Sequence, residues 1–167
     1  MSQPISLLIV LTAIGCGLTA GAFFAFSTFI MEALKRIPTP AGISAMQSIN
    51  VAVINPWFMS TLFLPVVFGM VLVGWSVMNW SRDGVGLLIA GELTYALGTV
   101  GVTIACNIPR NNRLAVVDPN SETGAAVWAT YLREWTMFNH VRTIGAVVAM
   151  VLLLIAWGKL KGATSLV

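Results

Sequence analysis

Long apolar runs separated by short polar stretches are the strongest pattern in this chain. Four of them extend over residues 5–34, 56–80, 85–106 and 141–158. A helix needs about 20 apolar residues to cross roughly 30 Å of hydrocarbon, and the fourth run is near the lower limit. The pattern therefore predicts four membrane-spanning helices.

The connection between the first two spans carries a helical period of its own. After a pair of prolines, the apolar residues Ile43, Met46, Ile49 and Val53 recur at steps of three or four. This spacing is typical of a helix with one apolar face. It predicts an interfacial or re-entrant helix between these spans.

The connection before the fourth span predicts a second amphipathic helix. Its loop sequence "DPNSETG" offers Asn120 or Ser121 as the N-cap. A helical face rich in Trp and Tyr is typical of the membrane interface. We therefore expect an all-α fold, an integral membrane four-helix bundle with one or two interfacial amphipathic helices, as a single transmembrane domain over residues 1–167. The face consists of Val127, Trp128, Tyr131, Leu132, Trp135 and Phe138.

Composition agrees with a membrane protein. Of 167 residues 57% are hydrophobic and only 9% are charged, against roughly 25% charged in soluble domains. We expect a multi-pass protein of the bacterial inner (plasma) membrane. The positive-inside rule would place the side with more basic residues in the cytoplasm. Without the arginines that are candidate site residues the count is nearly even, so the orientation stays open. The larger group is Lys35, Arg36, Arg110, Arg113 and Arg133, with Arg142 near it, and the smaller is Arg82, Lys159 and Lys161.

Charge and ligand counts exclude several kinds of site. The net charge of +3 is spread thinly, whereas nucleic-acid binding needs a concentrated basic face. Cys16 and Cys106 fall in separate predicted spans and are interpreted as small apolar fillers. With one histidine, the chain cannot supply the three or four ligands of a zinc site. We expect no metal site, although a haem with a single histidine ligand stays open.

The third span carries a polar face. Glu92, Thr99, Thr103 and Asn107 are spaced by seven, four and four residues and fall within about 80° of one another. Such a face must point into the bundle. For Glu92 two interpretations stand: a proton acceptor or partner of a buried cation, or a carboxylate near the helix start that reaches the interface. The sequence favours the second.

Polar side chains gather where the fourth span begins. Asn139, His140 and Arg142 lie within four residues, and Asn139 and Arg142 share a helix face. These residues are either interfacial anchors or part of a site. Further amides from the same side of the membrane favour a polar pocket with an aromatic lid. The additional candidates for substrate binding are Gln47, Asn50, Asn107, Asn111, Asn112, Trp128, Tyr131 and Trp135.

Three stretches together resemble a known family. They are "GAFFAFSTFIMEALKRIPTPAGISAMQSINVAVINPWFM", "NIPRNNRLAVVDP" and "WATYLREWTMFNHVRT". In order and spacing they resemble the anthrone oxygenase (DUF1772) family of small integral membrane proteins. The resemblance implies a four-helix membrane protein. In fungal members it implies the oxidation of anthrones to anthraquinones by molecular oxygen, with no known obligate cofactor.

Two elements of the family pattern are present in this chain. Asn111, Asn112 and Leu114 match an Asn-rich turn followed by Leu, and Trp135, Asn139 and Arg142 match a Trp followed by Asn-x-x-Arg. His140 resembles a feature of the bacterial branch of the family only. The resemblance therefore does not imply that this histidine is a base in all members.

The expected chemistry needs no metal. An anthrone loses a proton from its methylene, and the resulting enolate reacts with oxygen. Arg142, with Asn139 or Asn111, would stabilise the oxyanion. His140 would be the base, since imidazole suits proton transfer near neutral pH. Trp128, Tyr131 and Trp135 would stack on the flat substrate.

The expected partners follow from this hypothesis. They are the lipid bilayer and a hydrophobic aromatic small molecule, with oxygen as co-substrate and no cofactor. Assembly into a homo-oligomer stays open. The competing hypothesis is a protein without catalysis, which binds or transports a quinone-like molecule or serves as an accessory subunit.

Overall fold

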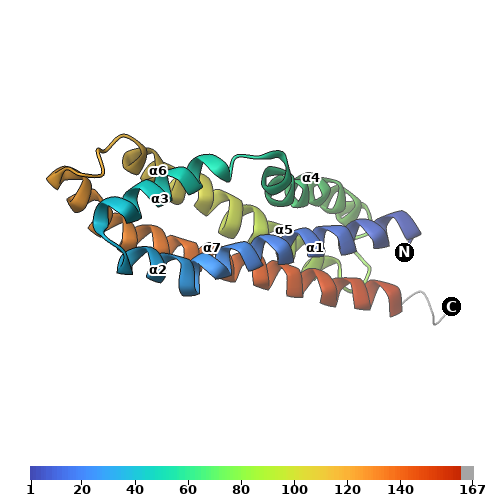
Figure 1. Cartoon of the computed structure of the whole chain (residues 1–167). Coiled ribbons are helices and arrows are strands. Elements are labelled where there is room, and N and C mark those ends of the chain that lie inside the picture. Colours follow the sequence, from blue (N-terminus) through green and yellow to red (C-terminus); the bar gives the residue numbers. More distant parts are fainter. Residues whose placement is uncertain (163–167) are drawn as a thin grey trace.

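The computed structural model describes residues 1–162 and is helical throughout, with short turns. Four helical segments are long and apolar enough to cross a membrane, as predicted: Gln3–Arg36, Pro56–Met78, Val85–Ala115 and Glu122–Gly162. Figure 1 shows them side by side in one elongated bundle. In chain order the elements are α1 (Gln3–Ala25), η1 (Phe26–Ile30), α2 (Met31–Arg36), α3 (Thr39–Ala52), α4 (Pro56–Met78), α5 (Val85–Tyr95), η2 (Ala96–Gly101), η3 (Thr103–Asn107), α6 (Ile108–Ala115) and α7 (Glu122–Gly162), where η marks π-helix.

The bundle core lies between α1, α4, α5 and α7. Ile9, Leu72, Leu88 and Leu153 are completely buried there, one from each helix. The start of α1 and the end of α7 lie at the same end of the bundle (Figure 1). At that end Lys159 pairs with Asp83 in the turn before α5, with Nζ 3.1 Å from the carboxylate. This is the arrangement expected for a chain that crosses the membrane four times.

Helix α7 differs from the prediction. The fourth span was expected to begin at residue 141, after a separate amphipathic helix, but one helix of 41 residues includes both. Nothing between its ends breaks a helix, because the segment contains no proline and its buried Asn139, Arg142 and Thr143 side chains are hydrogen-bonded. Its length is about 61 Å, twice the roughly 30 Å of a hydrocarbon layer. Its N-terminal half therefore extends beyond the hydrocarbon.

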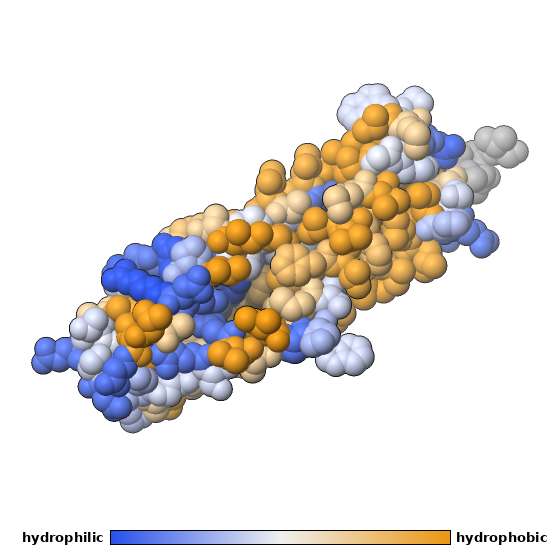
Figure 2. Space-filling model, turned by 90° about the horizontal axis from the view of Figure 1, so that it is seen from above, coloured by the Kyte–Doolittle hydropathy of each residue, from blue (hydrophilic) through white to orange (hydrophobic). Residues whose placement is uncertain are grey.

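That half of α7 supports a small polar head. We define the head as α2, α3, α6 and residues 122–138 of α7. Its own core includes Ile43, Met46 and Leu114, and hydrophilic residues gather at this end of the molecule (Figure 2). The interfacial helix predicted between the first two spans is α3. Ser121, one of the two predicted N-caps, accepts a hydrogen bond from the Gly124 amide at 2.9 Å.

The corner between α3 and α4 marks the membrane boundary. Val51, Ile54 and Trp57 are between 73% and 87% exposed. Large apolar side chains with this exposure need an apolar surrounding, and Trp is enriched where lipid meets water. The head therefore begins at the level where α4 begins.

Close helix packing explains one glycine pair. A Cβ built on Gly145 of α7 would lie 3.1 Å from the backbone of Gly98 in η2 and 3.1 Å from the Thr99 hydroxyl. We expect Gly145→Val to lower the free energy of unfolding by about 1 to 3 kcal/mol, because extra methyl groups force the two backbones apart. Thermal unfolding in detergent measures the loss.

Gly158→Val is the matched control, since none of the described residues lies within 4 Å of a Cβ at that position of the same helix. Equal melting temperatures for the two variants would contradict the close contact at Gly145.

Candidate active site at the head of the bundle

Arg142 is buried where the bundle core meets the head. The residue is only 5% exposed. Its guanidinium carbon lies 3.9 Å from the ring centroid of Phe23 and 4.7 Å from that of Trp135. Its Nε donates to Asn139 Oδ1 at 2.9 Å. Within residues 1–162 no carboxylate pairs with this guanidinium, and the other guanidinium nitrogens have no hydrogen-bond acceptor.

Asn139 fixes the position of that guanidinium. Its Nδ2 donates to the Phe23 carbonyl at 2.7 Å and to Ser27 Oγ at 2.6 Å. Both amide hydrogens are therefore used, and Oδ1 is turned toward Arg142. Thr143 Oγ1 donates to the Asn139 carbonyl at 2.7 Å, so Ser27 donates to Thr143 across 3.2 Å.

We refer to these residues as the Arg142 cluster: Phe23, Ser27, Trp135, Asn139, Arg142 and Thr143.

Three π-helical segments face this part of α7. Ser27 lies in η1, and Thr99 in η2 donates to the Arg142 carbonyl at 3.2 Å. Asn107 in η3 donates to the Trp135 carbonyl at 3.1 Å. Each added residue of a π-turn rotates the following side chains, and such segments occur frequently at functional sites. Here each one turns a polar side chain toward residues 135–143.

Stacked aromatic rings lead from the head to Arg142. The ring centroids of Trp128 and Tyr131 are 5.7 Å apart, with an interplanar angle of 15°. Those of Tyr131 and Trp135 are also 5.7 Å apart, at 19°. The Tyr131 hydroxyl donates to Asn111 Oδ1 at 2.8 Å and accepts from Asn50 Nδ2 at 3.5 Å. The three rings are buried against each other and do not form an open lid.

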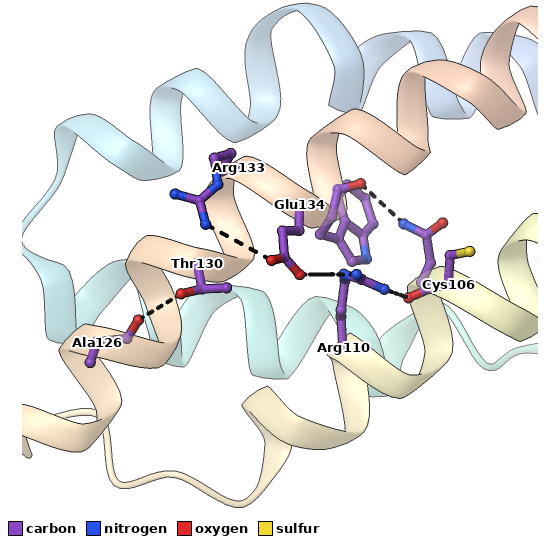
Figure 3. A network of polar contacts seen from close by, with 8 residues as sticks. Cys106, Arg110, Ala126, Thr130, Arg133 and Glu134 are labelled. Carbon is purple, nitrogen blue, oxygen red and sulfur yellow. Dashed lines mark hydrogen bonds and ion pairs between the residues drawn. The ribbon is translucent and has the colours of Figure 1, made fainter.

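A second arginine shows the contrast with Arg142. Arg110 in α6 reaches Glu134 in α7, with Nη2 2.9 Å from Oε2, and its Nη1 donates to the Cys106 carbonyl (Figure 3). It also lies over the Phe138 ring at 4.5 Å. This partly exposed ion pair connects α6 with α7. Arg110 therefore has a structural partner for its charge, and Arg142 has none among the described residues.

The Arg142 cluster lies near one boundary of the hydrocarbon layer. Arg142 and Lys159 are 17 residues apart in α7 (142 to 159), which corresponds to about 26 Å. Lys159 lies at the polar end with Asp83. Arg142 is therefore near the opposite face of a layer roughly 30 Å thick.

Unsatisfied polar atoms border the cluster. Trp135 Nε1 and Asn107 Oδ1 are buried and have no hydrogen-bond partner within the described residues. Buried polar atoms in native proteins are nearly always paired with protein or water. Together with the guanidinium nitrogens of Arg142 that have no acceptor among the described residues, they form a group of polar atoms that could pair with a ligand or with water.

The predicted site residues divide into three groups. His140 and Asn112 are exposed and point away from the cluster. For His140, one residue of helix turns the side chain about 100° from Asn139, and no contact with the Arg142 cluster supports its expected role as base. Gln47 donates to the carbonyls of Leu114 and Val117 at 2.9 and 3.0 Å, so it caps α6. The structure brings together Asn50, Asn107, Asn111, Trp128, Tyr131, Trp135, Asn139 and Arg142, whose roles in binding stay predictions.

Sequence reasoning missed Phe23 and Ser27. Ser27 had a usable signal, since it is a hydroxyl residue in an apolar run without charges. Phe23 had none, because the run around it is full of equivalent aromatic residues.

Glu92 also departs from the favoured interpretation. It does not reach the interface, since it is 5% exposed inside the bundle. The start of α5 is seven residues away, at Val85, which places the carboxyl about 10 Å along the helix. Glu92 is well separated from the Arg142 cluster.

The Tyr131–Asn111 hydrogen bond gives a test of this packing. We expect Asn111→Ala to lower the free energy of unfolding by about 1 to 2 kcal/mol, because the buried Tyr131 hydroxyl loses its acceptor. Chemical unfolding in detergent measures the loss. Asn112→Ala is the control, because Asn112 is the exposed neighbour on the same helix. Equal losses in both variants would show that the bond contributes nothing.

The chain matches one known protein family. The description of the matching family is anthrone oxygenase, and the match covers residues 56–152. Trp135, Asn139 and Arg142 fall inside the matched range. Neither a curated protein nor a solved structure matches the chain significantly. Because the matched range is more than half of the chain, the protein belongs to the anthrone oxygenase family.

Proposed function

We propose that this protein is a membrane-embedded oxygenase that acts on a flat phenolic substrate of the anthrone type. The Arg142 cluster is its active site, molecular oxygen is its co-substrate, and no cofactor takes part. Family membership supports oxygenase-like chemistry in general. The identity of the substrate, the absence of a cofactor and the roles of the residues are our proposal.

One observation carries it: the guanidinium of Arg142 is buried without an anion among the described residues. Removing a charge from water without a partner costs several kcal/mol. The two aromatic faces offset only part of this, since a desolvated cation–π contact contributes about 2 kcal/mol. An anionic oxygen on a ligand would offset the rest. Arginine in this state is therefore suited to bind an oxyanion that forms during a reaction.

The proposed reaction converts the methylene group of the anthrone into a ketone. The anthrone methylene loses a proton, and the negative charge moves to the oxygen atom of the ring ketone, beside Arg142. The electron-rich carbon then transfers electrons to oxygen and binds it as a peroxide. The peroxide takes up a proton and loses water, which leaves a second ketone. The overall change is anthrone plus oxygen to anthraquinone plus water.

The position of the cluster suits such a substrate. A tricyclic phenol dissolves in hydrocarbon, and Arg142 lies near the boundary where the hydrocarbon ends. The rings of Phe23 and Trp135 lie next to the guanidinium. Flat aromatic surfaces of this kind bind polycyclic ligands through offset or edge contacts.

The acceptor of the methylene proton is water rather than His140. His140 is exposed on the outer face of α7. We expect His140→Gln to oxidise an anthrone at the wild-type rate at every pH, because stabilisation of the enolate by Arg142 does not involve the imidazole. Initial rates between about pH 6 and pH 9 measure this, across the ordinary titration range of imidazole. A rate that falls and loses its pH dependence in this variant would restore the histidine as base.

A second candidate is binding of a quinone-like molecule without turnover. It is favoured by the absence of any imidazole or carboxylate in contact with Arg142 within the described residues. A binding site needs no base, whereas many enzymes use one.

The test that separates the two candidates uses the purified protein in detergent. Its visible spectrum is recorded first, because bound quinone or haem would be coloured. Anthraquinone formation from an anthrone in air is then followed, with the spontaneous rate subtracted. Saturable formation above that rate supports the oxygenase. Saturable binding of a hydroxyanthraquinone without any such rate supports the binding protein and refutes the oxygenase.

A further inference from the structure

A second polar position lies in the bundle, away from the Arg142 cluster. Glu92 in α5 is 5% exposed, and its Oε1 is buried without a hydrogen-bond partner among the described residues. The carboxyl lies against Gly69 of α4. A Cβ built on Gly69 would overlap Glu92 Oε2 and lie 2.9 Å from its Cδ. Glycine at position 69 therefore leaves the space that this carboxyl occupies.

Within residues 1–162 no cation faces this carboxyl. Helix α4 contains no titratable residue, and neither does α7 between Thr143 and Gly158. The titratable neighbours are Cys16 of α1 and Tyr95 of α5 itself, and neither is positively charged. A carboxylate in hydrocarbon without a cation costs several kcal/mol, and such a group marks a functional position by default.

A proton is the occupant that fits this position. Calcium and magnesium need about six oxygen ligands, and in residues 1–162 no three His, Cys, Asp or Glu side chains lie close enough to share a metal. A proton needs one carboxyl oxygen. Because glycine leaves the carboxyl room and no partner holds it, the proton can bind and leave without breaking a hydrogen bond of the described residues.

The surroundings differ on the two sides of Glu92. Toward the Arg142 cluster, the Tyr95 hydroxyl is engaged, at 3.1 Å from Thr19 Oγ1 and 3.0 Å from the Leu62 carbonyl. Toward the polar end with Asp83, Ser76 Oγ is buried without a partner. Ser76 lies seven residues after Gly69 in α4, which is about 10 Å along the same helix face. The unpartnered Ser76 hydroxyl therefore lies on the side of Glu92 that faces the polar end with Asp83.

We propose that Glu92, cradled by Gly69, is a proton-binding site inside the bilayer that exchanges its proton past Ser76 with the surface carrying Asp83 and Lys159. It is separate from the Arg142 cluster, and its existence does not depend on the oxygenase proposal.

Infrared spectroscopy tests the site directly. Difference spectra of the purified wild-type protein are recorded between about pH 6 and pH 9, above the ordinary titration range of exposed carboxyls. We expect a carbonyl-stretch band of a protonated carboxylic acid that decreases as the pH rises. The band should be absent in Glu92→Gln and present in Glu32→Gln, whose glutamate is exposed in α2. An unchanged band in Glu92→Gln, or no pH-dependent band in the wild type, would overturn the proposal.

Two further measurements complete the test. The first examines the route past Ser76, and the second uses the wild-type protein, so it remains valid if Glu92→Gln does not fold. In deuterated buffer we expect the band to exchange more slowly in Ser76→Ala than in the wild type, and equal exchange would overturn the route past Ser76. An apolar carbodiimide reacts with protonated carboxyls in membranes, so mass spectrometry of the treated wild-type protein should find Glu92 modified. An unmodified Glu92 would overturn the site. None of these readouts uses anthrone oxidation, so failure here and failure of the proposed function are distinguishable.

Discussion

Arg142→Met is expected to reduce the rate of anthrone oxidation above the spontaneous rate by about 10²- to 10³-fold, the usual effect of removing one oxyanion donor. Methionine fills a similar space between Phe23 and Trp135 but offers no positive charge. The free energy of unfolding should change little, because removing the unpaired buried charge offsets the loss of the donor to Asn139 Oδ1. A loss of rate without a loss of stability is the signature of a functional residue. Oxidation rates and melting temperatures of the same preparation measure both.

Arg133→Met is the matched control. Arg133 is an exposed arginine on the same helix, at the edge of the Glu134 carboxylate with a separation of 3.9 Å. Neither the rate nor the stability should change in this variant. A full rate in Arg142→Met would refute the oxyanion role.

Asn139→Leu is expected to give the largest loss of stability, about 3 kcal/mol or more. The change leaves the Phe23 carbonyl, Ser27 and the Arg142 guanidinium without their shared partner. Each buried polar group that loses its partner costs about 1 to 3 kcal/mol, and a charged one costs more. Equilibrium unfolding in detergent measures the loss. His140→Leu is the control at the next position, where the exposed side chain makes no such bonds.

The double variant tests the reason for this loss. When Arg142→Met is combined with Asn139→Leu, no buried charge is left unsupported. The double variant should therefore be more stable than Asn139→Leu alone, because residues in one network are not additive. Strictly additive losses would contradict the coupling of Asn139 to Arg142.

The spans and the aromatic face could be predicted because they depend on local periodicity. Apolar runs of roughly 20 residues identify the spans, and steps of three and four place Trp128, Tyr131 and Trp135 on one face. The same arithmetic separates His140 from Asn139 by about 100°. Helical periodicity does not determine which of these two faces of the helix points into the bundle. The structure decides that, and it leaves His140 outside.

The continuity of α7 and the position of Glu92 could not be predicted, because both depend on partners far apart in the sequence. From the sequence alone, Asn139 and Arg142 are typical of a membrane boundary. In the structure the Phe23 carbonyl and Ser27 accept hydrogen bonds from Asn139, which in turn accepts from Arg142. Because Glu92 lies near a helix start, the sequence suggests an exposed side chain. In the structure Gly69 of α4 leaves the space that the buried carboxyl occupies. The π-helical segments shift the register of Ser27, Thr99 and Asn107 without any sign in the local sequence.

The most direct test of the Arg142 cluster is an experimental structure of the protein with a hydroxyanthraquinone bound. We expect a ligand oxygen within hydrogen-bond distance of a terminal nitrogen of Arg142, and the ring system against Phe23 or Trp135. A ligand bound elsewhere, with Arg142 still unpaired, would contradict the assignment of this cluster as the active site.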